Sequence, residues 1–98
     1  MAKEVVWDEK ALLYLEQALD WISQESFVQA DNVENAIQEG ISKVTEYPES
    51  YPLDKFKRNN TGKYRAFETH NYRISYTYND DQILILRVRH VKQSPLYF

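Results

Sequence analysis

The side chains of this sequence that are best suited to chemistry are cations in its second half. Residues 55–98 contain nine of the twelve Lys and Arg residues but only three acids, a net charge of +6. Residues 1–54 contain three Lys residues and twelve acids, a net charge of −9, so the total of −3 hides a strongly basic half. Guanidinium and ammonium groups bind phosphates and carboxylates, and this half therefore predicts a surface for an anion or an acidic partner.

Five of these cations lie in segments with the two-residue period of a strand, and we expect them on one face of a sheet. They are Lys63, Arg65, Arg73, Arg87 and Arg89. An ordinary solvated face stays open as an interpretation, because antiparallel sheets often leave one face in water. Such a face usually carries both signs of charge. The alternation places Glu68 on the other side or at a turn, which favours a functional surface.

The two histidines differ in their sequence context. His90 is in phase with apolar residues at the end of the last predicted strand, beside Arg89 and Lys92. Neighbouring cations favour the neutral imidazole, which makes His90 a candidate proton acceptor. A structural hydrogen-bonding role is the alternative. His70 is expected to be a turn residue.

The chain ends on an aromatic pair, Tyr97 and Phe98. Two interpretations stay open for this pair: a terminal anchor that folds onto the protein, or a contact for a partner.

The composition excludes several kinds of site. The absence of cysteine removes thiol chemistry, zinc-thiolate sites and iron–sulfur clusters. Two glycines cannot build a phosphate-binding loop, and with two histidines we expect neither a metal site nor a cofactor. No apolar run approaches the roughly 18 residues of a membrane helix, and the first residues lack the apolar stretch of a signal peptide. We therefore expect no membrane partner and a protein that stays where it is made.

The first half predicts a short strand and a helical hairpin. Residues 3–7 read as the strand, and Asp8 is placed to cap a helix over about 9–24, because a carboxylate there accepts from the first amides of the helix. Ser26 and Gln29 have the capping-box spacing that begins a second helix. Pro48 stops that helix.

The second half predicts three strands joined by tight turns. They span Lys63 to Glu68, Tyr72 to Tyr78 and Gln82 to Val91, with turns at residues 69–71 and 79–81. Connections this short allow only antiparallel neighbours. The whole chain, residues 1–98, is therefore predicted as one α+β domain in which the helices pack on one face of a three-stranded antiparallel meander.

Alternation also predicts which strand residues face the helices. These are Tyr72, Ile74, Tyr76 and Tyr78 in the middle strand, Leu84, Leu86, Val88 and His90 in the last, and Tyr64 and Ala66 in the first. Phe67, Ile83 and Ile85 would then share the opposite face with the five cations.

Two segments have a specific pattern: Tyr72-Arg73-Ile74-Ser75-Tyr76, and the ending from Ile85 to Lys92. Together with the order strand, helix, helix and three strands, they resemble the RelE/ParE superfamily of bacterial toxins over essentially the whole chain. The resemblance implies a cytoplasmic toxin of a type II toxin–antitoxin pair, associated with growth inhibition and plasmid stabilisation, and held inactive by a cognate antitoxin.

The resemblance implies two different target classes. RelE-like members cleave mRNA on the ribosome with basic groups of the open sheet face, and Lys63, Arg65 and Arg73 match those positions while His90 would act as acid or base. ParE-like members poison DNA gyrase and do no chemistry on RNA. We favour the second class slightly, because the ending from Arg89 to Pro95 and the acidic total charge resemble it more.

Further residues are candidates for contact with the target or with the antitoxin. They are Arg87, Arg89, Lys92, Tyr97 and Phe98. A degenerate toxin that retains only antitoxin binding is the third possibility.

Overall fold

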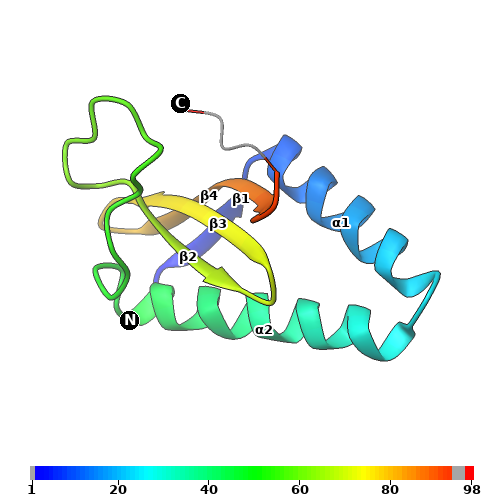
Figure 1. Ribbon diagram of the computed structural model, residues 1–98. Helices are drawn as coiled ribbons and strands as arrows, with labels where there is room; N and C mark the ends of the chain where they lie inside the picture. The colour runs from blue at the N-terminus through cyan, green and yellow to red at the C-terminus, as the bar shows by residue number, and fades with distance from the viewer. Residues whose placement is uncertain (1, 94–96) are drawn as a thin grey trace.

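A mixed four-stranded sheet of order β1-β4-β3-β2 organises the computed structural model, which describes residues 2–93 and 97–98 (Figure 1). The elements are β1 (Glu4–Trp7), α1 (Glu9–Ser23), α2 (Phe27–Glu46), β2 (Arg65–Thr69), β3 (Tyr72–Tyr78) and β4 (Gln82–His90). The antiparallel meander is confirmed for β2, β3 and β4. The N-terminal strand joins the sheet beside β4 and runs parallel to it, which makes the sheet mixed.

Both helices begin at the capping residues that the sequence predicts. The Asp8 carboxylate accepts hydrogen bonds from the amides of Lys10, at 2.9 Å, and Ala11, at 3.4 Å. The Ser26 hydroxyl accepts from the amide of Gln29 at 3.1 Å. These bonds satisfy amides that have no partner within the helix, and so fix where each helix starts.

No helix in residues 2–93 is long and apolar enough to cross a membrane.

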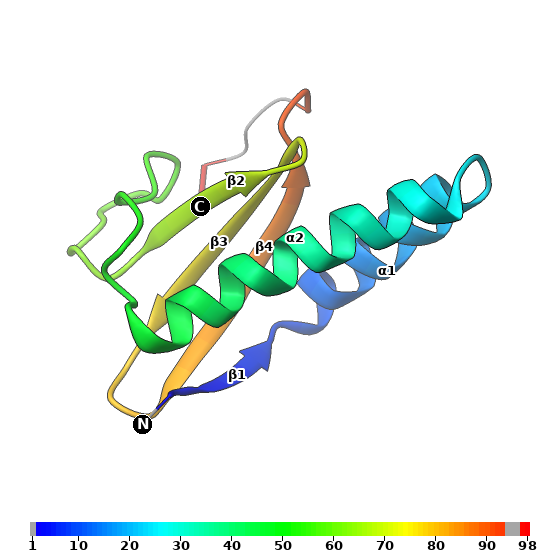
Figure 2. The ribbon, with the colours of Figure 1, turned by 90° about the horizontal axis from the view of Figure 1, so that it is seen from below.

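The two helices form a hairpin on one face of the sheet and bury the core between the two layers (Figure 2). Helix α1 packs mainly on β4, and α2 packs on β2. The centre of the core is fully buried and joins α2 to β3 and β4 through Ile37, Val44, Ile74, Ile83 and Ile85.

The face assignment predicted for β4 is wrong in its first half. Ile83 and Ile85 are fully buried, whereas Leu84 and Leu86 are only partly so. The cause is a β-bulge: Tyr76 pairs with Ile85 and the preceding Ser75 pairs with Arg87, which leaves Leu86 as an extra residue. An extra residue reverses the alternation, so one phase cannot hold along the whole strand.

The face assignment predicted for β2 is also wrong. The strand begins at Arg65, so Lys63 lies outside it. Arg65 is opposite Tyr76 and Phe67 is opposite Ile74, which places both on the helix side. Phe67 is 4% exposed, and its burial sets the register of the strand, because a slip by one residue would expose it.

The turn between β2 and β3 is shorter than predicted. His70 and Asn71 both have positive φ, 48° and 71°, as the two central residues of a type I′ turn require. Thr69 belongs to β2, and β4 ends at His90, one residue before the predicted Val91. His70 is thus confirmed as a turn residue.

Stability is expected to fall as the pH rises above about 10, in part because of Tyr76. This side chain is fully buried, its hydroxyl donates to the Pro48 carbonyl at 2.7 Å, and burial raises its pKa, with a smaller opposing effect from Arg65. Unfolded tyrosine loses its proton near pH 10 while the folded protein keeps it, so unfolding becomes easier by up to about 1.4 kcal/mol per pH unit.

Urea unfolding of the Tyr76→Phe variant at pH 8 to 11 measures this effect. The fall of stability with pH should be shallower than in the parent chain. Tyr47→Phe is the control, since Tyr47 is 63% exposed. Equal pH slopes in the parent and Tyr76→Phe would contradict the assignment.

Candidate functional site

Three arginines share the sheet face that points away from the helices, here called the arginine face: Arg73, Arg87 and Arg89. In the register of β3 and β4, Arg73 is directly opposite Arg89, and Ser75 is opposite Arg87. Like charges directly opposite each other destabilise a sheet. The β3–β4 pairing therefore gathers positive charge at a cost in stability.

Two carboxylates hold Arg73. Its Nη2 atom donates to Asp54 Oδ1 at 3.0 Å, and its Nη1 atom donates to Glu68 Oε2 at 2.9 Å. The guanidinium also lies over the Phe56 ring, 4.9 Å from its centroid. The Asp54 side chain has no exposed surface, and Oδ1 accepts a second hydrogen bond from the Phe56 amide at 3.0 Å. Arg73 is thus fixed in position with its charge compensated.

These acids correct the prediction that the face carries cations alone. Glu68 is directly opposite Arg73 and lies on the arginine face, whereas the sequence placed it on the other side or at a turn. A two-residue turn at His70–Asn71 places residue 68 opposite residue 73. Recognising the two-residue turn in the sequence would therefore have predicted the contact between Glu68 and Arg73. Asp54 comes from the irregular connection before β2, and no spacing in the sequence pointed to it.

The prediction that this face is uncovered is wrong, because the connection between α2 and β2 covers part of the arginine face. The connection between α2 and β2 is held along β2 by the bonds Asp54 N–H to Tyr64 O, 2.8 Å, and Ala66 N–H to Pro52 O, 3.2 Å. This connection brings Phe56 over Arg73. Part of the face is therefore built from this irregular connection and not from the strands themselves (Figure 1).

The C-terminal pair packs against the same connection. Phe98 donates its amide to the Phe56 carbonyl at 3.0 Å and lies over the Arg87 guanidinium, whose carbon is 4.5 Å from the ring centroid. Tyr97 meets Phe56 edge-on at 5.6 Å. These are the contacts of a terminal anchor. Tyr97 nevertheless keeps 57% of its surface exposed, so contact with a partner stays a prediction.

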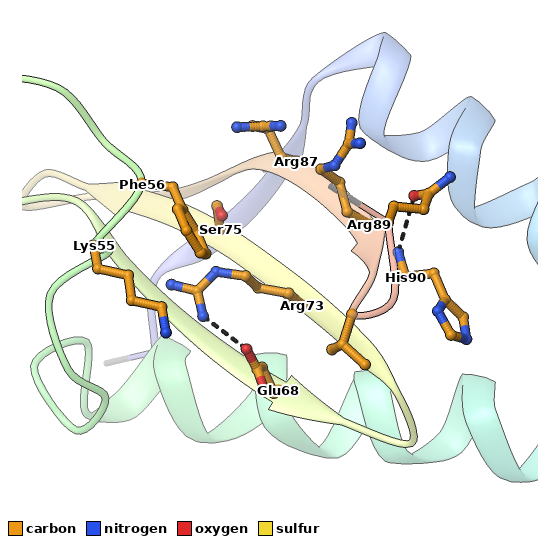
Figure 3. Close-up of a pocket in the computed structure, with 10 residues that line it drawn as sticks. Lys55, Phe56, Glu68, Arg73, Ser75, Arg87, Arg89 and His90 are labelled. Carbon is orange, nitrogen blue, oxygen red and sulfur yellow. Dashed lines mark hydrogen bonds and ion pairs between the residues drawn. The ribbon is translucent and has the colours of Figure 1, made fainter. Parts of the chain in front are cut away.

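A pocket of about 210 Å³ opens between these groups (Figure 3). Its lining comes from the connection before β2 and from the three C-terminal strands and the turn after them: Lys55, Phe56, Glu68, Arg73, Ser75, Arg87, Arg89, His90, Val91 and Gln93. Burial lowers the pKa of Arg87, the charge of Arg89 lowers it further, and Asp54 partly opposes this.

The His90 ring points away from the arginines (Figure 3). It meets Tyr72 edge-on at 5.2 Å, and its Nδ1 atom accepts from the Lys92 amide at 3.1 Å. Tyr14 donates its hydroxyl to Gln93 Oε1 at 2.6 Å and accepts from the His90 amide at 3.1 Å. These hydrogen bonds connect the end of β4 to α1. His90 and Gln93 therefore have a structural role in this network.

The residues predicted for RNA cleavage do not converge. Lys63 is exposed and precedes β2. Arg65 lies on the helix side, where its Nη1 atom donates to the Tyr51 carbonyl at 2.6 Å. Arg73 is bonded to two acids, and His90 packs on Tyr72. Of the predicted binding residues, Arg87, Arg89 and Phe98 do gather at the arginine face, and Lys92 is exposed just after β4.

Comparison with known families gives one assignment. Residues 5–95 match the family described as the ParE toxin of the type II toxin–antitoxin system, parDE. A comparison with curated proteins gives no match. The match spans nearly all of the four-stranded sheet and its helical hairpin, and the chain therefore belongs to the ParE toxin family of type II toxin–antitoxin systems.

Proposed function

We propose that this toxin inhibits bacterial growth by binding DNA gyrase, without cleaving RNA, and that a cognate antitoxin neutralises it. The observation that carries the proposal is the state of Arg73, whose two terminal nitrogens are bonded to Asp54 and Glu68. Membership of a family of type II toxins supports the antitoxin partner.

RNA cleavage by attack of a ribose hydroxyl needs cations aimed at the charge that develops on the phosphate. Arg73 is the arginine of the motif that RelE-like nucleases use in this way, but here its charge is already compensated by two carboxylates at 2.9 and 3.0 Å. Arg65 points to the other side of the sheet, toward Tyr51. A toxin that acts by binding a protein does not need such catalytic cations, and the arginine face offers it a charged surface.

A ribosome-dependent mRNA endoribonuclease is the second candidate. The positive charge gathered at the pocket favours it, because Lys55, Arg73, Arg87 and Arg89 line the pocket and phosphates bind to clusters of cations. The residues proposed for contact with the target or the antitoxin are the same in both cases. They are Arg87, Arg89, Lys92, Tyr97 and Phe98.

Two reconstituted assays with the purified, unaltered chain separate the candidates. One measures supercoiling of plasmid DNA by purified gyrase, together with DNA breaks trapped on the enzyme. The other maps the 5′ ends of an mRNA translated on purified ribosomes. We expect inhibition of supercoiling or trapped breaks at equimolar toxin, and an intact mRNA.

New mRNA ends within translated codons, with gyrase unaffected, would overturn the proposal in favour of the nuclease. Expression in a bacterium without any antitoxin provides the remaining comparison. Unaffected growth, with both assays negative, would indicate a degenerate toxin that retains only antitoxin binding.

A further inference from the structure

We propose that the loop over residues 55–63, here called the basic loop, contacts the phosphates of duplex DNA where the toxin is bound to gyrase. That this DNA is the segment held by gyrase rests on the proposed function. The phosphate-binding surface itself rests on the charge, the fixed shape and the side-chain composition of the loop.

The first support is a local concentration of positive charge. The basic loop contains four cations and no acid. The cations are Lys55, Lys57, Arg58 and Lys63. Within residues 2–93 and 97–98, no carboxylate forms an ion pair with any of the four. Ammonium and guanidinium groups of this kind neutralise phosphates and release the counterions that surround DNA.

Acids that contribute to the total charge of −3 include a group far from the basic loop. Figures 1 and 2 show the connection between α2 and β2, which contains the loop, at the opposite end of the molecule from the turn between α1 and α2. Asp20, Glu25 and Asp31 lie in that turn or in the helix ends beside it. The molecule extends 40 Å along its longest axis, and in 0.1 M salt charges are screened beyond about 10 Å. A phosphate at the basic loop is therefore little repelled by these three acids.

The second support is that the loop is held in one shape. Its ends meet through the hydrogen bond from the Asp54 amide to the Tyr64 carbonyl, at 2.8 Å. The Asn60 side chain bonds across it, because its Nδ2 atom donates to the carbonyls of Tyr64, at 2.8 Å, and Asp54, at 3.3 Å. The Arg58 amide donates to the Phe98 carbonyl at 2.5 Å. The cations project from an ordered backbone, which lowers the entropy cost of binding.

The third support separates a duplex from a single strand. Proteins that bind single strands stack the bases on aromatic rings. The rings at the basic loop already have cations over them. Lys55 Nζ lies 5.2 Å from the centroid of the Phe56 ring, and Lys57 Nζ lies 4.7 Å from that of Tyr64. The loop is therefore better suited to phosphates, which a duplex presents while its bases stay stacked on each other.

The exposed side chains of the loop separate a phosphate backbone from a protein partner. All of them are polar: Lys55, Arg58, Asn59, Thr61 and Lys63. The buried centre of a protein–protein interface is depleted of Lys and enriched in aromatic residues and Met. Lys, Arg, Asn and Thr are among the side chains that contact phosphates without reading the base sequence.

The test is a fluorescence-anisotropy titration of a labelled DNA duplex of about 20 base pairs with the full chain, in the absence of gyrase. Four phosphate contacts predict that log K falls against log salt with a slope of about −3.6, or roughly a hundredfold loss of affinity between about 50 and 200 mM salt. Arg58→Gln should reduce the slope by about 1, and Arg58→Lys should keep it. Lys10→Gln removes the same charge from the exposed start of α1, and it should leave slope and affinity unchanged.

Absence of duplex binding at the lowest salt concentration would overturn the proposal. Equal slopes in the parent chain and Arg58→Gln would do the same. A single-stranded RNA and polyglutamate, at equal concentration of negative charge, serve as competitors. Stronger competition by either one than by unlabelled duplex would overturn the duplex site in favour of RNA or of an acidic protein segment.

The supercoiling assay links this surface to the proposed target. If the parent chain inhibits gyrase, the double variant Arg58→Gln with Lys63→Gln should need at least about fivefold more toxin for the same inhibition, because two phosphate contacts are lost. Equal inhibition by the double variant would overturn the contact with DNA held by gyrase. A parent chain that binds the duplex but leaves gyrase unaffected would disprove the target and retain the phosphate-binding surface.

Discussion

Replacing Asp54 with alanine is expected to lower the free energy of unfolding by about 3 kcal/mol, the lower end of the range for breaking a buried ion pair. The Asp54 side chain is fully buried and accepts from both Arg73 and the Phe56 amide. Its loss leaves a guanidinium that is only 16% exposed with Glu68 as its remaining carboxylate, and leaves the Phe56 amide without its acceptor. The lower end applies because Glu68 still compensates part of the charge.

Urea denaturation followed by circular dichroism measures this loss. Asp54→Asn keeps an acceptor for Phe56 while it removes the charge, and should therefore fall between the parent and Asp54→Ala. Glu34→Ala is the control, because Glu34 is exposed in the middle of α2, and it should change stability by less than about 0.5 kcal/mol.

A second variant pair tests whether charge or packing is responsible. If the ion pair mainly avoids an uncompensated charge, Asp54→Leu combined with Arg73→Met should be more stable than Asp54→Leu alone, because neither partner is left behind. A loss below about 1 kcal/mol in Asp54→Ala would contradict the buried pair as an anchor of the connection before β2.

The helices and the number of strands could be predicted from local signals. Asp8 and Ser26 cap helices through contacts within three residues. Pro48 ends a helix because proline fixes its own φ angle and lacks the amide hydrogen, whatever the tertiary context. The faces of the strands could not be predicted equally well, because alternation carries information only while the register is unbroken. The extra Leu86 reverses the phase of β4, and the burial of Phe67 decides that of β2.

The candidate site could be predicted only where the register of its strands is unbroken. Arg73, Arg87 and Arg89 lie on the expected face because β3 is regular and both β4 arginines follow the bulge. Arg65 was misplaced with its strand. Asp54 was missed because a long-range contact from an irregular connection leaves no periodic trace in the sequence, although it determines which arginine is compensated.

The contact between Gly40 and Phe67 gives the second large expected effect. A Cβ atom at position 40 would overlap the Phe67 ring, meeting Cε2 directly and Cζ at 2.7 Å. The ring has little room to move, since it is 4% exposed and stacks on Tyr51 with centroids 4.8 Å apart. Gly40→Ala is therefore expected to cost about 2 kcal/mol through overpacking, although alanine is the better helix former by about 1 kcal/mol.

A double-mutant cycle with Phe67→Leu identifies the cause. As a single substitution, Phe67→Leu lowers stability because it removes buried ring contacts. In the double variant, the smaller side chain leaves space for the new methyl group at position 40. The double variant should be more stable than the sum of the single effects predicts, by at least about 1 kcal/mol. Gln38→Ala, at an exposed position of the same helix, should be neutral or slightly stabilising. Additive effects in the cycle would mean that Gly40 is needed for another reason than the close approach of α2 to β2.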